Sequence, residues 1–444
     1  MNTSDLQAQL GRFRKPAMVA GVVGLAVWLL GGVLGLASGE GGMFSLHRFF
    51  AAYVVAFLFW FGVTAGSLSL LMVHHVTGGG WGFIIRRQLE AGTRLLPIMA
   101  IAFLPIAITV LMGNQSLYWW ARPENANDHI LSSGQGKYLN VPFFLIRWVI
   151  YFVALGAMSR VLNKGSFEQD QRKDDSVYER LTNFSAVGLL LYTLLMTFAI
   201  VDLLMSLTPH WFSSIIGLLF VAAQGLSTFA VMHAIVSRLG RNTEALKAVP
   251  SGYFRDLGNL TLAFVLLWAY GSFSQFLIYY SGNTAESAGW YVQRMSGGWQ
   301  YVGTILIVAH FFFPLTVLIT NSGMKRNPHR LARIGFYLIL MRFIDLTWWV
   351  APTFHSSLAN FLPSIWIYIG AFVGLGGVWL SLWSAQMMNH LKDRPLLPAF
   401  DPRLGREWTF EREQLGAKDS STPTSTNTTD TTTNNPTSGK VQHG

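Results

Sequence analysis

Ten long apolar segments fill most of this 444-residue sequence. They run at about 17–37, 48–74, 94–113, 141–163, 183–208, 212–238, 257–281, 299–321, 331–351 and 362–390. A transmembrane helix needs about 20 mainly apolar residues, and longer segments can tilt or protrude. Charged residues make up only 12% of the chain, roughly half the share found in soluble domains. The sequence therefore predicts an all-α integral membrane protein with ten transmembrane helices.

Lysine and arginine alternate between two sets of connections. The rich set carries Arg12, Arg14, Lys15, Arg86, Arg87, Arg94, Arg160, Lys164, Arg172, Lys173, Arg180, Arg238, Arg241, Lys247, Arg255, Lys325, Arg326, Arg330, Arg333, Lys392 and Arg394. The poor set carries only Arg48, Arg122, Lys137 and Arg294. Since the positive side of a membrane protein faces the cytoplasm, we expect a multi-pass protein of the bacterial inner membrane with both termini in the cytoplasm.

Three regions follow from the same pattern. Residues 1–16 form a short cytoplasmic segment, 17–412 the membrane domain, and 413–444 a tail of Ser, Thr, Asn and Gly. Such a tail cannot bury apolar surface and is predicted to be disordered. The first apolar segment is longer than the roughly 7–15 residues of a signal-peptide core, and no small-x-small cleavage site follows it. We therefore expect it to be retained as a helix.

Composition also excludes several kinds of site. The chain has no cysteine, which rules out disulfides, thiolate metal sites, iron–sulfur ligation and c-type haem attachment. The net charge of +10 does not indicate nucleic acid as a partner, because the basic residues fall in short connections between apolar segments. The partner that the composition does predict is the lipid bilayer.

A thirteen-residue pattern occurs twice, at 202–214 and 345–357. Each copy begins with an aspartate, has a proline seven residues later and ends in a Ser-Ser pair, and 143 residues separate the copies. This offset relates the fifth segment to the ninth, and a shift of four segments preserves direction across the membrane. We expect two four-helix bundles, segments 2–5 and 6–9, that are parallel repeats, with the first and tenth helices peripheral.

Asp202 is the leading candidate for chemistry, together with His210. An aspartate at membrane depth costs about 2.5–3.5 kcal/mol on insertion scales, so it is expected to have a function or a partner. By the predicted topology both residues lie toward the outer surface, near Trp211. A carboxylate and an imidazole can accept two protons from a bound diol. We expect these residues to form an outer site, either for quinol or at the exit of a proton path. The alternative interpretation is that Asp202 pairs with a neighbouring residue and His210 lies at the membrane interface.

Asp345 has a different surrounding, because Arg342 lies three residues earlier on the same helix face. An ion pair that stabilises the bundle is the favoured interpretation, and a proton relay is the alternative. The other candidates for a proton path are histidines inside apolar segments: His310, His233, His74 and His75. His310 is the strongest because it is near the middle of its segment. No helix carries the two well-separated histidines of a two-haem bundle, so we expect no haem, flavin or metal in this chain.

The run Asp202–Ser214 resembles a signature of the F subunit of alternative complex III, a bacterial quinol:electron-acceptor oxidoreductase. The stretches Phe264–Tyr279, Gly298–Gln300 and His310–Pro314 are similar as well. This family belongs with the NrfD-like, polysulfide-reductase-type membrane subunits. One departure is Thr208, which stands where an acidic residue is expected before the proline. Thr208 cannot ionise, so a role for a second carboxylate at the outer rim is in doubt.

The resemblance implies two four-helix bundles and a subunit that binds no cofactor. It implies menaquinol or ubiquinol as the substrate of the complex, and haem c and iron–sulfur clusters in partner subunits. A sister NrfD-like subunit would be the better candidate for the quinol site, and a terminal oxidase is a further candidate partner. The chain would then support quinol oxidation, and in one version proton translocation, without being catalytic alone.

Two other functions remain open from the sequence. A secondary transporter can also have ten helices with a parallel repeat, but its helices should be interrupted near the midplane. Here the prolines lie mainly at segment ends, with Pro105 and Pro314 as exceptions. The third possibility is a purely structural membrane anchor that recruits partners through its loops and tail.

Overall fold

The computed structural model describes residues 3–38, 44–132, 134–172, 175–240 and 249–398. The long helices are α1 (Thr3–Ser38), α2 (Leu46–Thr77), α8 (Val141–Arg172), α9 (Asp175–Leu203), α10 (Ile216–Gly240), α12 (Ser251–Gly282), α17 (Pro328–Val350) and α19 (Ile365–Asp393). The shorter ones are α3 (Gly80–Thr93), α4 (Leu96–Ala102), α5 (Leu104–Leu111), α6 (His129–Ser132), α7 (Gln135–Tyr138), α13 (Ala285–Arg294), α14 (Trp299–Ile305), α15 (Phe313–Thr320), α16 (Ser322–Arg326) and α18 (Leu358–Phe361).

Nine helical segments in the described ranges are long and apolar enough to cross a membrane. A tenth is obtained if Gly80–Thr93 and Leu96–Leu111, which meet at a bend of 44°, count as one span. The predicted all-α membrane fold is therefore confirmed. Helix α1 begins at Thr3, so most of the predicted N-terminal segment 1–16 belongs to the first long helix. The tail predicted at 413–444 lies outside the described residues.

The third predicted span, at 94–113, differs from the structure. Helix α3 occupies the preceding stretch, which the Lys/Arg pattern assigned to an inner connection, and its residues are buried. Gly78 and Gly79 have positive φ angles, 69° and 95°, and make the turn from α2 into α3. Pro97 and Pro105 stand in the first turns of α4 and α5. Since proline cannot continue a helix interior, the chain bends between α3 and α5.

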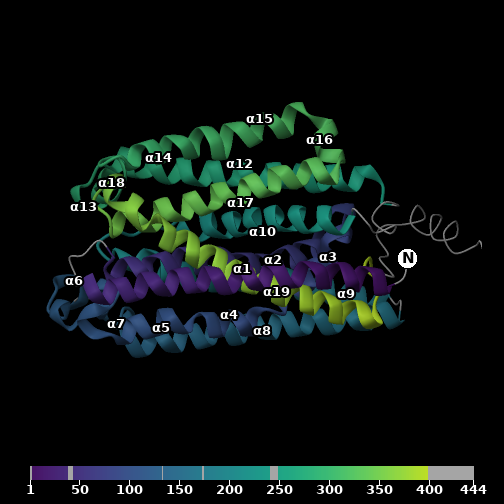
Figure 1. The fold of residues 1–444 in the computed structure, drawn as a ribbon, viewed down its shortest axis with the longest axis horizontal. Coiled ribbons are helices and arrows are strands. Elements are labelled where there is room, and N and C mark those ends of the chain that lie inside the picture. Colours follow the sequence, from purple (N-terminus) through teal and green to yellow (C-terminus); the bar gives the residue numbers. More distant parts are fainter. Residues whose placement is uncertain (1–2, 39–43, 133, 173–174, 241–248, 399–444) are drawn as a thin grey trace, which may run out of the picture. The chain divides into compact units, whose positions relative to one another are not determined.

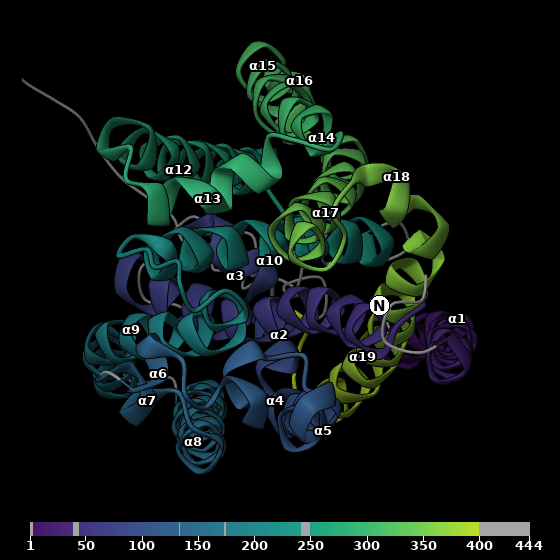
Figure 2. The same ribbon diagram turned by 90° about the vertical axis from the view of Figure 1, so that its left-hand side faces the viewer.

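Helices α2 and α10 occupy the centre of the bundle (Figures 1 and 2). Helix α2 packs on α9, and α10 packs on α17 in the same way. The cross-contacts also match, because α9 touches α10 while α17 touches α2. Helices α1 and α19 pack on each other beside α2. This arrangement has the two predicted bundles, with α2 to α9 in one and α10 to α17 in the other.

Apolar side chains cover the outward faces of the outer helices. Val19 and Leu36 on α1, Val153 on α8, and Tyr270 and Phe273 on α12 are all exposed. By contrast, the most apolar part of α2 is completely buried within the protein. Extensive exposed apolar surface is uncommon on soluble proteins, so these faces are the ones that lipid would cover.

Glycines let α1 and α19 approach closely. Gly21 and Gly24 of α1 face Gly374 and Gly377 of α19. A Cβ atom on Gly374 would lie 2.6 Å from the backbone nitrogen of Leu25. Without side chains at these positions the two backbones meet directly, as in the small-residue interfaces typical of membrane helices.

We expect Gly374→Ala to loosen this pair of helices. The new methyl group would meet backbone rather than a movable side chain, and overpacking of this kind costs about 1–3 kcal/mol. Thermal unfolding of the detergent-purified protein should therefore shift to lower temperature. Gly156→Ala is the control, because a Cβ there meets nothing within 4 Å. Equal unfolding temperatures for the two variants would contradict the close-packing interpretation.

Candidate functional site

Asp202 near the end of α9 is fully buried and paired. Its two carboxylate oxygens accept hydrogen bonds from Nε and Nη2 of Arg147 at 2.9 and 2.7 Å. The hydroxyl of Tyr151 donates to the same carboxylate at 3.0 Å. Both partners come from α8, so this bidentate pair joins α8 to α9. A carboxylate with two guanidinium donors and a phenol is well satisfied, which favours the structural interpretation of Asp202.

Arg147 is itself enclosed by the loop that precedes α8. Its Nη1 donates to the carbonyl oxygen of Tyr138 at 2.9 Å, and its guanidinium carbon lies 3.8 Å from the centre of the Tyr138 ring. Burial, followed by the negative charge of Asp202, raises the pKa of the Tyr138 hydroxyl, so this phenol stays protonated. The predicted pair of Asp202 with His210 is not among these contacts.

His210 instead lines a cavity of about 620 Å³ at the same end of the protein. Its ring meets Trp119 edge to face with 5.1 Å between the ring centres. The cavity walls come from both bundles and include Arg48, Arg122 and Trp290, but not Asp202. The structure therefore separates the two residues that the sequence placed in one site: Asp202 is in a buried ion pair and His210 is in an accessible cavity.

The second bundle holds a different cluster around Asp345. Arg342 forms an ion pair with Asp345 on α17, and its Nε donates to Ser227 of α10 at 3.2 Å. The indole nitrogen of Trp268 on α12 donates to Asp345 at 3.2 Å. The ring of His310 lies tilted against that of Trp268, with 4.0 Å between the ring centres. Four helical segments thus converge on one buried group of polar residues.

His310 has an unusual environment within this cluster. It is completely buried, and neither ring nitrogen has a hydrogen-bond partner among the described residues. It also lies in a π-helical segment, Leu306–Phe312, that interrupts the eighth span between α14 and α15. Buried polar groups without partners are rare, and π-helical turns are frequent at functional sites.

The remaining histidine candidates lie apart from His310 and have ordinary partners. His233 on α10 bonds to the hydroxyl of Thr261 at 2.7 Å. That hydroxyl donates to Leu257, so the imidazole is the donor. His75 contacts Ser185 at 3.1 Å, and His74 near the end of α2 meets Trp81 in the first turn of α3 edge to face. These contacts fit packed, hydrogen-bonded residues.

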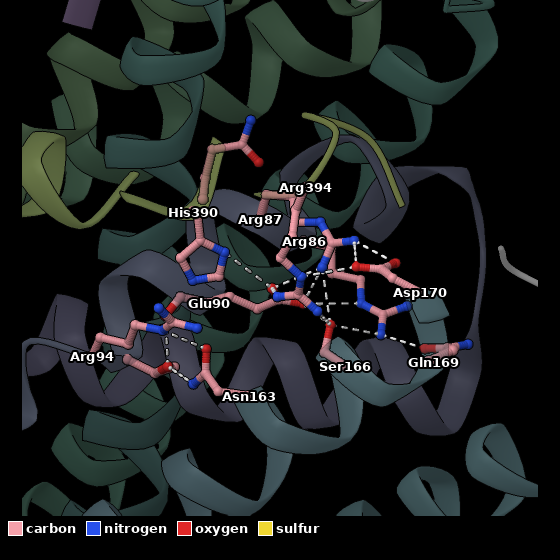
Figure 3. A network of polar contacts seen from close by, with 12 residues as sticks. Arg86, Arg87, Glu90, Arg94, Asn163, Ser166, Gln169, Asp170, His390 and Arg394 are labelled. Carbon is pink, nitrogen blue, oxygen red and sulfur yellow. Dashed lines mark hydrogen bonds and ion pairs between the residues drawn. The ribbon is translucent and has the colours of Figure 1, made fainter. Parts of the chain in front are cut away.

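A large buried network at the end of the protein opposite the His210 cavity was not predicted from the sequence (Figure 3). Glu90 of α3 is completely buried and accepts bonds from Arg86, Arg87 and the hydroxyl of Ser166. Arg87 also binds both oxygens of Asp170 on α8, at 2.7 and 2.5 Å.

Two more arginines complete this network, which Figure 3 shows as one group of side chains. Arg394, just after α19, bonds to Glu90 at 3.3 Å and pairs with Asp170 at 2.9 Å. Arg94 donates to Asn163 of α8 at 3.0 Å. The network therefore joins α3, α8 and the end of α19. In the sequence, the arginines of residues 86–94 indicated a cytoplasmic loop. The signal that could have revealed a buried cluster is Glu90, the carboxylate among these arginines.

No protein-family model and no curated protein sequence match this chain. The candidate sites are therefore interpreted from their own geometry: a paired carboxylate in the first bundle, an imidazole with no hydrogen-bond partner among the described residues in the second, and a cavity where the two bundles meet.

We expect Arg147→Met to destabilise the protein strongly. It leaves Asp202 buried without its counter-charge, which costs about 3–5 kcal/mol. The double variant Arg147→Met/Asp202→Leu removes both charges and should recover most of the loss. Thermal unfolding followed by tryptophan fluorescence measures all three proteins. A double variant no more stable than Arg147→Met would show that the ion pair is not what makes Arg147 important.

Glu90 should be far more sensitive to substitution than Glu168, a partly exposed acidic residue at the same end. Glu90→Gln removes the negative charge from among buried guanidinium groups, with an expected loss of about 3–5 kcal/mol. Glu168 bonds to Arg172 and Arg180 nearer the surface, where a pair is worth about 0–1 kcal/mol. Unfolding temperatures of Glu90→Gln and Glu168→Gln test this difference, and similar values for both would refute it.

Proposed function

We propose that the chain is an integral subunit of a bacterial respiratory quinol-oxidising complex of the alternative complex III type. In this proposal it spans the cytoplasmic membrane with both termini inside, and it carries protons rather than oxidising quinol itself. Its partners would be a sister NrfD-like subunit, an iron–sulfur subunit and haem-c subunits. The resemblance of Asp202–Ser214 and of the later stretches supports the family, and the geometry of the second bundle supports the role.

The observation that carries the proton-transfer role is the His310 cluster. His310 is buried with no hydrogen-bond partner in the described part of the chain, so it would gain and lose a proton without first breaking a bond to those residues. Asp345 is the carboxylate of the same cluster, and Trp268 contacts both Asp345 and His310. Intramembrane ionisable residues of this kind mark proton relays in pumps and transporters.

The other members of the cluster have supporting roles. Trp268 is a hydrogen-bond donor only, so it orients Asp345 and cannot itself pass a proton onward. Arg342 supplies a positive charge beside Asp345, and its own hydrogen bond to Ser227 links α17 to α10. In this proposal His310 is the residue that changes protonation, because Asp345 is already paired with Arg342. The first bundle has no such freedom, since Arg147 and Tyr151 already hold Asp202.

A secondary transporter is the second candidate, and one observation favours it. The π-helical segment Leu306–Phe312, followed by Pro314 in the first turn of α15, interrupts a span near its middle, where transporters place their binding sites. Isolation with redox partners distinguishes the two functions, because a transporter has no need of haem or iron–sulfur subunits.

The test begins with a tagged full-length chain isolated from its native membranes. We expect it to co-purify with subunits that give the absorbance of c-type haem and iron–sulfur clusters. The complex is then reconstituted in liposomes, where quinol oxidation and proton release are recorded together. His310→Phe should lower the protons released per electron substantially while quinol oxidation continues, because the relay is lost and the redox site is not.

His129→Phe is the matched control, since His129 is an exposed residue of α6. Absence of redox subunits from the purified material would sink the assignment to a quinol-oxidising complex. A wild-type proton ratio in a correctly assembled His310→Phe complex would leave the chain as a structural subunit.

A further inference from the structure

The π-helical segment Leu306–Phe312 sets the direction in which His310 faces. Buried side chains recur at every fourth position along this part of the span: Leu306, His310, Pro314 and Leu318. In a regular α-helix, with 3.6 residues per turn, a spacing of four residues turns by about 40° at each step, so the four side chains would not share a face. The wider π-helical turn reduces this drift, and within it His310 lies against Trp268.

Pro314 accounts for the position of this turn. In a regular α-helix its ring would clash with the carbonyl group of His310, four residues earlier. The amide of Phe313, the residue before the proline, donates to the carbonyl oxygen of Val308, five residues earlier. That bond has the spacing of a π-helix, so the main chain shifts its register by one residue just before Pro314.

The shift deprives the carbonyl oxygen of Ala309 of its main-chain donor. In an α-helix that donor would be the amide of Phe313, which instead bonds to Val308. In a π-helix it would be the amide of residue 314, and proline has no N–H. The hydroxyl of Tyr337 on α17 donates to this oxygen at 2.7 Å. An unsatisfied carbonyl is costly where lipid replaces water, so the hydroxyl stabilises the π-helical turn.

The ring of Tyr337 is itself held against the same span. It packs on Phe313, the first residue of α15, with 4.8 Å between the ring centres. Helix α17 also carries Asp345, eight residues further along. One helix therefore supplies both the carboxylate of the His310 cluster and the hydroxyl that fixes the turn on which the imidazole stands.

We infer that Tyr337 is a positioning residue for His310. Its hydroxyl takes the place of the main-chain donor that Pro314 lacks, and so keeps the π-helical turn in which the imidazole meets Trp268. Without the hydroxyl, the carbonyl of Ala309 regains a donor only if the turn closes to an α-helix. A register change of one residue rotates one end of the span by about 100° relative to the other. The consequence for proton transfer rests on the function proposed above, whereas the positioning itself does not.

Histidine NMR of the full-length chain in nanodiscs tests the position of His310 without any redox partner. The protein is labelled with ¹³C,¹⁵N-histidine, and the His310 signals are those that disappear in His310→Phe. The ring current of Trp268 shifts these signals, and Trp268→Leu defines their position without the indole. We expect Tyr337→Phe to move the His310 signals most of the way to the position seen in Trp268→Leu, because the turn closes and carries the imidazole away.

Tyr270→Phe is the matched control, because it removes a hydroxyl from a tyrosine of α12 that is 70% exposed. Its His310 signals should match those of the wild type. Pro314→Ala should reproduce the shift of Tyr337→Phe, since it removes the clash and supplies an N–H, so the segment can close as an α-helix. Unchanged His310 signals in Tyr337→Phe would overturn the inference, and so would equal shifts in Tyr337→Phe and Tyr270→Phe.

Proton release by the reconstituted complex gives the functional readout. Tyr337→Phe should lower the protons released per electron toward the value of His310→Phe, while quinol oxidation continues. Displaced His310 signals together with a wild-type proton ratio would refute the link between this turn and proton transfer. A wild-type ratio in His310→Phe would refute the proposed function alone, and the NMR comparison would still decide whether Tyr337 positions the imidazole.

Discussion

A buried charge in an apolar bundle requires a partner, and this requirement organises the described structure. Removing one partner of a buried pair costs about 3–5 kcal/mol, because the remaining charge has no water to replace it. Asp202 meets Arg147 at 2.7 Å, and Glu90 lies among Arg86, Arg87 and Arg394. The first pair joins the consecutive helices α8 and α9, and Arg394 joins the end of α19 to α3, which is distant in the sequence. The positions of α8 and α9, and of α3 and the end of α19, follow from these contacts as much as from apolar packing.

The two bundles use the duplicated aspartate differently. The carboxylate of the first bundle is held by an arginine from another helix and by a phenol. The carboxylate of the second bundle is paired within its own helix; α12 presents Trp268 to it, and the eighth span places His310 against Trp268. Helix α17 has Arg342 where α9 has Ala199, at the same offset of 143 residues. Arg342 thus supplies within α17 the counter-charge that Asp202 of α9 receives from Arg147 of α8.

The fold was largely predictable from the sequence, because long apolar segments permit few structures in a membrane. The pair Arg342–Asp345 was also predictable, because side chains three residues apart on a helix lie on the same face. The partner of Asp202 was not, because Arg147 lies 55 residues away and nothing in the local pattern marks which helix will face it. Helix α3 was misassigned for a related reason. Positive charge in a connection indicates a side of the membrane, but it does not indicate whether the arginines meet water or a buried glutamate.

The central claim is that His310 changes its protonation state during turnover of the complex, and quinol-triggered infrared difference spectroscopy tests it most directly. Complex labelled with ¹⁵N-histidine is compared with the unlabelled complex and with His310→Phe. The account predicts imidazole bands that appear on quinol addition, shift with the isotope and are absent from the variant. Identical histidine bands in the variant and the wild-type complex would contradict it.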